Sequence, residues 1–239
     1  PRVHVVITGI EKVVPTLEDA ALLLRLLTRS ATGQPITNYV SLLTGPRRAD
    51  DPDGPEYFYV ILVDNGRSKL LGGELQAMLR CIRCGACMNH CPVYQNVGGH
   101  AYGWVYPGPM GAVLTPSFVG LENARDLPDA STLCGACAAV CPVNIPLPDL
   151  LRTLRVQRTK RGLRPWSERL ALKLWGWLAR HPSIYGVATG LAARWLHWFG
   201  GQQGLLHRLP FAAGWTDGRD LPAPSGHTFR ELYREQRHA

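Results

Sequence analysis

The stretch CIRCGACMNHCP, residues 81–92, places four cysteines within eleven positions and follows the last one with a proline. A shorter version, CGACAAVCP, occupies residues 134–142. A C-x2-C-x2-C turn wraps three thiolates around one face of a four-iron cluster, so a fourth thiolate has to come from elsewhere in the chain. Together the two runs predict a pair of iron-sulfur clusters.

The order of the cysteines predicts which thiolates share a cluster. In two-cluster ferredoxins the cysteine that precedes the proline binds the other cluster of the pair. By this rule the first cluster takes three thiolates from the first run and one from the second, namely Cys81, Cys84, Cys87 and Cys141. The second cluster takes one from the first run and two from the second, namely Cys91, Cys134 and Cys137.

The second cluster lacks a fourth cysteine. Counting back from Cys141 places Ser131 where the first cysteine of the second run would stand. Three outcomes fit: a three-iron cluster, a four-iron cluster bound by Ser131 or another oxygen or nitrogen ligand, or a four-iron cluster with one open iron. A serine hydroxyl is harder to deprotonate than a thiol and suits iron less well. We expect two four-iron clusters, of which the second is incomplete or labile.

Zinc is the main alternative for these cysteines. A structural zinc site uses four ligands, whereas this chain offers seven cysteines in two runs, each ending in Cys-Pro. His90 and His100 lie nearby in sequence, and we expect them to be hydrogen-bond donors or plain loop residues rather than ligands. The cysteine pattern therefore favours iron-sulfur clusters over zinc.

Composition agrees with a metal protein of the cytoplasm. All seven cysteines lie between residues 81 and 141, an odd number that does not suit a disulfide framework. The chain begins at Pro1 and shows no signal-peptide pattern, which favours a cytoplasmic fragment of a longer protein.

Charged residues interrupt every apolar window, so no membrane span is expected. The basic residues that give the net charge of +8 are scattered along the chain, and no nucleic-acid-binding motif accompanies them. No nucleic-acid partner is therefore expected.

Residues 1–66 have an α/β pattern. Residues 3–9 and 57–66 are rich in β-branched and aromatic residues and predict buried strands, and 36–45 predict a third strand. Thr16 can cap a helix that runs to Gly33. Three strands and one helix cannot close an α/β domain, so this segment is expected to be the end of a larger one.

Residues 67–160 are expected to form an α-helical ferredoxin domain, with helices at 68–80 and 147–162 flanking the two cysteine runs. The segment 94–132 between the runs, rich in glycine, proline and aromatic residues, predicts an ordered loop. Its aromatic residues Tyr94, Trp104 and Tyr106 either pack over the clusters or face a partner.

Residues 161–239 predict a helical extension. Helices are expected over 166–181 and 183–200, with Trp175, Trp177, Trp195 and Trp198 packed into a helical core. The last thirty residues are expected to be extended or frayed.

These motifs resemble a known family. RCIRCGACMNHCPVYQNVGGHAYGWVYPGPMGAVLTP (80–116) and DLPDASTLCGACAAVCPVNIPLPDLL (126–151) are similar to the iron-sulfur subunit of the bacterial three-component lactate-utilisation system, the LutB or LldF-type family. Residues 4–46 resemble the end of that family's N-terminal lactate-utilisation (LUD) domain, and 164–182 with 214–234 resemble its C-terminal extension. The resemblance implies an N-terminally truncated, multi-part α+β protein.

The resemblance also implies a function. It implies electron transfer in the oxidation of L-lactate to pyruvate, together with a cysteine-rich subunit and a second LUD-domain subunit. We therefore expect an electron-transfer subunit without an active site of its own. Two alternatives stay open: an open iron of the second cluster that acts on substrate as a Lewis acid, and a redox-sensing or iron-sensing binding protein.

Overall fold

The computed structural model describes residues 1–37, 39–209 and 212–238. Contacts divide the chain into two compact units, Pro1–Leu163 and Arg164–Ala239, and each is described by itself. Among the described residues, no helix is both long enough and apolar enough to cross a membrane.

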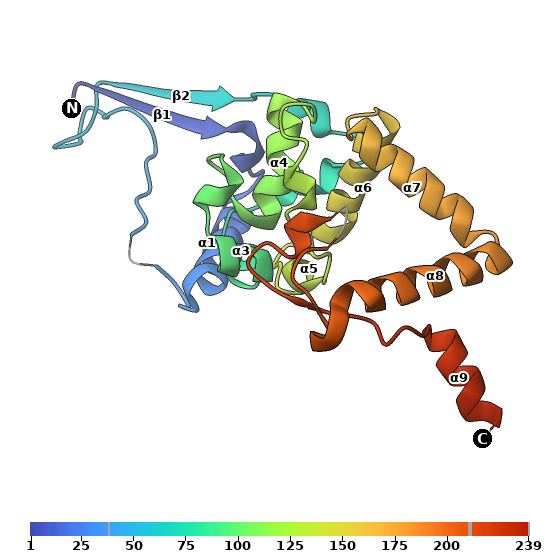
Figure 1. The fold of residues 1–239 in the computed structure, drawn as a ribbon. Coiled ribbons are helices and arrows are strands. Elements are labelled where there is room, and N and C mark those ends of the chain that lie inside the picture. Colours follow the sequence, from blue (N-terminus) through green and yellow to red (C-terminus); the bar gives the residue numbers. More distant parts are fainter. Residues whose placement is uncertain (38, 210–211, 239) are drawn as a thin grey trace. The chain divides into compact units, whose positions relative to one another are not determined.

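The first unit begins with a strand–helix–strand segment. Strands β1 (Val3–Gly9) and β2 (Tyr57–Val63) pair in parallel, from Val3 opposite Tyr57 to Gly9 opposite Val63 (Figure 1). Helix α1 (Leu17–Thr32) lies between them in the chain. The Thr16 hydroxyl accepts a hydrogen bond from the Asp19 N–H at 3.1 Å, and Gly33 ends the helix in the left-handed region at φ 75°. Both predicted ends of this helix are confirmed.

Two predictions for this segment are wrong. The described residues of 36–45 contain no strand, and residue 38 lies outside the described residues. Apolar composition gives a strand propensity, but a strand forms only where a neighbouring strand satisfies its N–H and C=O groups. The strands β1 and β2 are also exposed rather than buried: Ile7 is 69% exposed and Tyr59 54%.

The rest of the first unit contains short helices around two longer ones. A 3-10 helix at Ser68–Leu70 and another at Gln76–Arg80 precede the first cysteine run. The chain then forms α2 (Ala86–Asn89), α3 (Pro92–Val97), a 3-10 helix at His100–Tyr102, α4 (Gly108–Val119), a 3-10 helix at Leu127–Asp129, α5 (Ala136–Ala139) and α6 (Leu147–Lys160). The predicted helix at 147–162 is confirmed, whereas 68–80 forms only short 3-10 turns.

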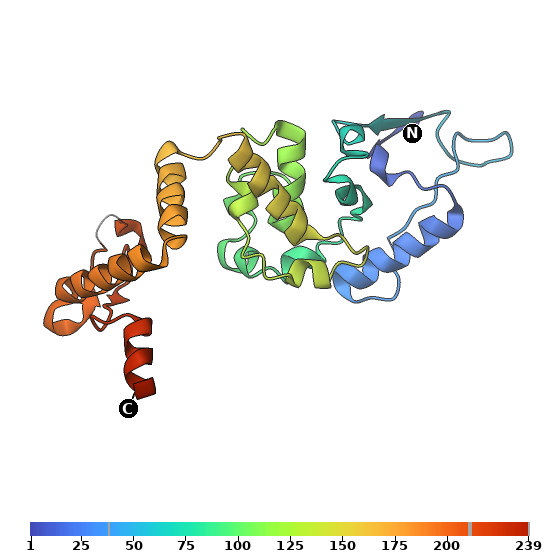
Figure 2. The same cartoon turned by 90° about the vertical axis from the view of Figure 1, so that its right-hand side faces the viewer.

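The core of this unit lies between α4 and α6, which run side by side in both views (Figures 1 and 2). Val113 of α4 and Leu151 of α6 are fully buried. Helix α4 corrects the expected loop at 94–132: its sequence GPMGAVLTPSFV is apolar on all sides, so it lacks the amphipathic period that identifies a surface helix. A Cβ on Gly111 would lie 1.5 Å from the carbonyl oxygen of Tyr106, so this close approach requires glycine.

The second unit is mainly helical. Helices α7 (Trp166–Ala179) and α8 (Pro182–Gly200) are followed by a 3-10 helix at Gly201–Gln203 and strand β3 (Leu205–Leu206). A 3-10 helix at Ala213–Trp215, strand β4 (Leu221–Pro222), antiparallel to β3, and helix α9 (Phe229–His238) complete it. The two predicted helices are confirmed.

Two other predictions for the second unit are wrong. The last thirty residues contain α9 and β4 rather than an extended tail, although residues 210, 211 and 239 lie outside the described residues. The four tryptophans expected in a helical core are exposed, from 42% for Trp195 to 76% for Trp198. Local ring contacts do form, since Trp195 and Trp198 both contact Phe199.

A buried ion cluster joins the N-terminal segment to the first cysteine run. Glu11, whose side chain is 8% exposed, pairs with Arg67 at 2.6 Å and with Arg83 at 2.8 Å. Arg83 also lies over the ring of Tyr106, to whose hydroxyl its guanidinium donates a hydrogen bond at 2.7 Å. The chain segments before and within the cysteine run therefore meet at the Glu11 carboxylate, and Arg83 links them to Tyr106 after the run.

Replacing Glu11 should destabilise the first unit strongly. Glu11→Gln removes the negative charge and leaves Arg67 buried without it, which costs about 3 kcal/mol of unfolding free energy by analogy with other broken buried pairs. Urea titration of anaerobically prepared protein measures this change.

The control is Glu56→Gln, which removes the exposed pair between Arg2 and Glu56. That change should cost less than about 1 kcal/mol. Equal effects of the two substitutions would contradict a structural role for the buried cluster.

Candidate iron-sulfur site

The first cysteine run forms a tight loop because two of its residues adopt left-handed backbone conformations. Arg83 has φ 59° and Gly85 has φ 81°, and α2 begins directly after Gly85. Glycine adopts this region freely, whereas an arginine there is uncommon. The ion pair of Arg83 with Glu11 and its contact with Tyr106 hold this conformation in place.

Four thiols from two distant parts of the chain line one pocket. They are Cys81, Cys84 and Cys87 of the first run and Cys141 of the second. Apolar side chains complete the lining, among them Met78, Met110, Ile145 and Leu147. The structure therefore brings together the four residues that the sequence assigned to the first cluster, including the one expected to cross from the other run.

Burial makes these thiols poor acids on their own. It raises the pKa of Cys87 to about 12, with the backbone N–H of Met110 acting in the opposite direction. Burial likewise raises the pKa of Cys81, against the effect of the Arg83 N–H. Only the thiolate binds metal, so the pocket favours deprotonation only when positive charge enters it. A pocket of four thiols with an otherwise apolar lining fits an iron-sulfur cluster by the chemistry of its donors.

The other three cysteines do not line this pocket. Cys91 and Cys137 are buried, at 6% and 7% exposure, whereas Cys134 is exposed. Burial is the largest cause of the raised pKa of Cys137, and the nearby thiols of Cys91 and Cys134 raise it further. Cys137 therefore lies within electrostatic range of Cys91 and Cys134, but also of Cys87, so the grouping of Cys91, Cys134 and Cys137 around a second cluster stays a prediction.

All seven cysteines are free thiols in the structure. Among the described residues, no three His, Cys, Asp or Glu side chains lie close enough together to hold a single metal ion. The site is thus defined by which thiols share a pocket or a neighbourhood rather than by a coordination distance.

Backbone N–H groups also donate hydrogen bonds to cysteine sulfurs other than that of Cys87. The N–H groups of Arg83, Tyr94 and Ile145 donate to the sulfurs of Cys81, Cys91 and Cys141 at 3.4, 3.5 and 3.4 Å, respectively. Such bonds stabilise a thiolate and raise the reduction potential of a bound cluster by offsetting its negative charge.

Neither histidine near the first run lies in the pocket. The Nδ1 atom of His90 lies 3.1 Å from the carbonyl oxygen of Ala86, and His100 is exposed in a 3-10 helix. That neither histidine binds a cluster stays a prediction.

The aromatic residues after the first run differ in their packing. Tyr94 contacts the ring of Tyr102, and Tyr106 contacts Phe118. Trp104 is 46% exposed. Tyr94 and Tyr106 thus pack against other rings, while packing over the clusters and a docking role for Trp104 both stay predictions.

Sequence reasoning missed Tyr102 and Lys12. Tyr102 is 6% exposed, and burial together with the neighbouring Cys91 raises its pKa to about 12. The Lys12 ammonium donates to the carbonyl oxygen of Cys81 at 3.1 Å, and burial followed by Arg83 lowers its pKa. Lys12 lies far from the cysteines in sequence, so no local pattern could have identified it.

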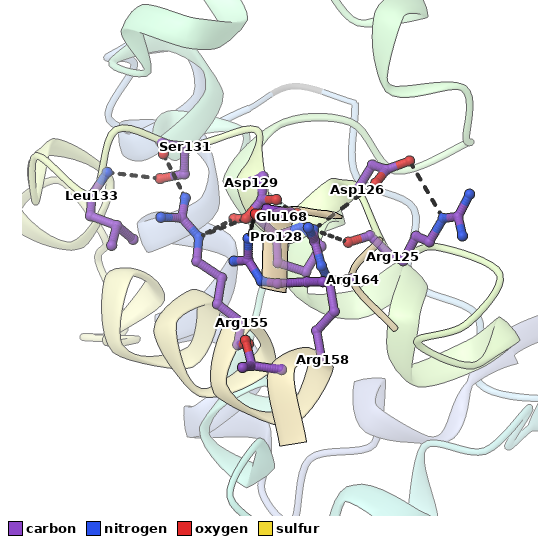
Figure 3. Close-up of polar contacts among 11 residues, drawn as sticks. Arg125, Asp126, Pro128, Asp129, Ser131, Leu133, Arg155, Arg158, Arg164 and Glu168 are labelled. Carbon is purple, nitrogen blue, oxygen red and sulfur yellow. Dashed lines mark hydrogen bonds and ion pairs between the residues drawn. The ribbon is translucent and has the colours of Figure 1, made fainter. Parts of the chain in front are cut away.

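The loop that carries Ser131 is held by two arginines of α6 (Figure 3). Arg155 donates to the carbonyl oxygens of Pro128 at 2.8 Å and Ser131 at 2.7 Å, and pairs with Asp129 at 3.3 Å. The buried Arg158 also pairs with Asp129. Charge-assisted bonds of this kind are stronger than neutral ones, so this loop is well anchored.

Three family models match consecutive parts of the chain. The LUD domain matches residues 1–63, the 4Fe-4S dicluster domain matches 77–145, and the C-terminal domain of lactate utilisation protein B matches 152–238. The dicluster match covers both cysteine runs and the segment between them.

Curated proteins match along almost the whole chain. Lactate utilization protein B of Lysinibacillus sphaericus is 47% identical over 99% of this chain and 50% of its own length. The protein of the same name from Shouchella clausii is 48% identical over 98% of this chain and 49% of its own length. No solved structure matches. The chain spans about half the length of these relatives, and along that half it is similar to the lactate utilisation protein B family.

Proposed function

We propose that this chain is an electron relay with two iron-sulfur clusters in a complex that oxidises L-lactate to pyruvate. The observation that carries the proposal is the convergence of Cys81, Cys84, Cys87 and Cys141 on one pocket. A thiol from the second run among three from the first is the arrangement that a two-cluster ferredoxin requires. The name of the similar proteins, lactate utilization protein B, supplies the link to lactate.

Each cluster changes its charge by one electron at a time, whereas oxidation of lactate releases two electrons and two protons. A pair of neighbouring clusters can take these electrons singly. In this proposal lactate is oxidised on another subunit, which retains the protons or passes them to solvent. The chain's own residues hold the clusters, exclude water and stabilise charge through backbone N–H groups.

The proposed domains follow the sequence divisions. Residues 1–66 are the end of a LUD domain, 67–160 the α-helical ferredoxin domain, and 161–239 the helical extension. The proposed partners are a cysteine-rich subunit and a second LUD-domain subunit, and the proposed compartment is the cytoplasm, where free thiols persist. The exposed tryptophans of α7 and α8 are available for contact with such subunits.

The relay can be tested by following cluster reduction. Electron paramagnetic resonance of the anaerobic protein should show reduced clusters when L-lactate is added together with the partner subunits, and no reduction when L-lactate is added alone.

Two other outcomes would overturn the proposal that the chain is an electron relay. Reduction of the isolated protein by L-lactate would favour chemistry at its own second cluster. Formation of pyruvate by the complex while the clusters stay oxidised would remove them from the electron path.

Crossing of the ligands gives a second prediction. Cys141→Ala should remove or convert the cluster held by Cys81, Cys84 and Cys87, because Cys141 lines their pocket. The cluster nearer to Cys141 in sequence should keep its resonance signal. Iron content and the resonance spectrum measure both effects.

The matched variant is Cys134→Ala, which should affect only the second cluster. If Cys141→Ala and Cys134→Ala damaged the same cluster, the crossed assignment would be wrong.

A further inference from the structure

The loops that begin at Cys81 and Ser131 have the same backbone shape. Two residues after Cys81, Arg83 has φ 59°; two residues after Ser131, Leu133 has φ 56°. Gly85 and Gly135 follow at φ 81° and 86°, and each precedes a four-residue helix, α2 or α5. A left-handed conformation is uncommon for arginine or leucine, so its recurrence at the same offset indicates one loop geometry used twice.

The side chains at the two starting positions also make the same contact. The sulfur of Cys81 accepts a hydrogen bond from the Arg83 N–H at 3.4 Å. The hydroxyl oxygen of Ser131 accepts one from the Leu133 N–H at 3.1 Å. Relative to its own loop, the serine oxygen therefore takes the place that the ligand sulfur takes in the first loop.

A cation holds the carbonyl group of each starting residue. Lys12 donates to the Cys81 carbonyl oxygen at 3.1 Å, and Arg155 donates to the Ser131 carbonyl oxygen at 2.7 Å (Figure 3). In Figure 3 the Arg155 side chain reaches from α6 to the Ser131 loop. Backbone shape, side-chain contact and carbonyl anchor thus all agree between the two positions.

We propose that Ser131 is the fourth ligand of the second cluster, through its hydroxyl oxygen, and that it holds its iron more weakly than a thiolate would. The inference rests on the proposed function, because it requires Cys91, Cys134 and Cys137 to hold that cluster. The hydroxyl loses its proton to solvent when the Fe–O bond forms, and the Leu133 N–H then donates to the alkoxide. Oxygen is a harder and less favourable ligand than thiolate for iron-sulfur chemistry, so this iron leaves first.

In this arrangement Arg155 is a positioning residue. It touches the carbonyl group of Ser131 rather than the hydroxyl, and it also fixes the preceding turn through Pro128 and Asp129. Arg155 keeps the Ser131 hydroxyl in the orientation that the Cys81 sulfur has in the first loop.

The test compares Ser131→Ala and Ser131→Cys with the unchanged protein, all prepared anaerobically and then exposed to an iron chelator. Iron per chain and the resonance signal of an oxidised three-iron cluster measure retention of the fourth iron. We expect Ser131→Ala to hold roughly one iron fewer per chain than Ser131→Cys from the outset. The unchanged protein should start with that iron and lose it to the chelator faster than Ser131→Cys.

Three other results would each contradict the assignment of Ser131. Equal retention in Ser131→Ala and the unchanged protein would overturn the assignment of Ser131 while the intact first cluster upheld the proposed function. Faster loss in Ser131→Cys than in the unchanged protein would also overturn it. Failure of the unchanged protein to bind iron and sulfide at all would overturn the proposed function and this assignment together.

The positioning role has its own control. Arg155→Gln should lose the fourth iron faster than the unchanged protein, with the first cluster's signal preserved, and Ser131→Cys in the same chain should restore retention. The matched variant is Arg152→Gln on the same helix, since Arg152 is exposed. Equal loss in Arg155→Gln and Arg152→Gln would contradict the role of Arg155.

Discussion

The electrostatics of buried thiols dominate this structure. Cys81 and Cys87 lie in a pocket whose other walls are apolar, and burial raises the pKa of both thiols. Four thiolates in such a place would repel one another and lack water to stabilise them. The pocket becomes favourable only when a strongly positive group enters it, so the fold and the bound group must stabilise each other.

The surrounding chain supports the same site from outside the cysteine runs. Helix α4 packs against α6 and forms the core that carries the pocket, while Glu11 joins Arg67 to Arg83. Buried ion pairs are weak contributors to net stability, but they are costly to break, and so they fix one arrangement of the groups they join. The carboxylate of Glu11 thereby couples the N-terminal segment to the loop between Cys81 and Cys84.

Sequence patterns predicted the features that depend on residues close together in the chain. The ends of α1 follow from Thr16 and Gly33, and the four thiols that line one pocket are those that the cysteine spacing groups together. Helix α4 was missed because a helix buried on every side has no amphipathic period. Lys12 and Glu11 were missed because they act on residues about seventy positions away, and no property of their own neighbours marks them.

The two matching loops differ in what anchors them, and this difference has a physical consequence. Lys12, which holds the Cys81 carbonyl, belongs to the N-terminal segment, whereas Arg155, which holds the Ser131 carbonyl, belongs to α6. A displacement of the N-terminal segment would therefore move Lys12 and Glu11 together and disturb the first loop. It would leave the second loop attached to α6 through Arg155 and Asp129. A movement of the N-terminal segment would therefore change the charges around the Cys81 loop. The charges around the Ser131 loop would instead change with the packing of α6.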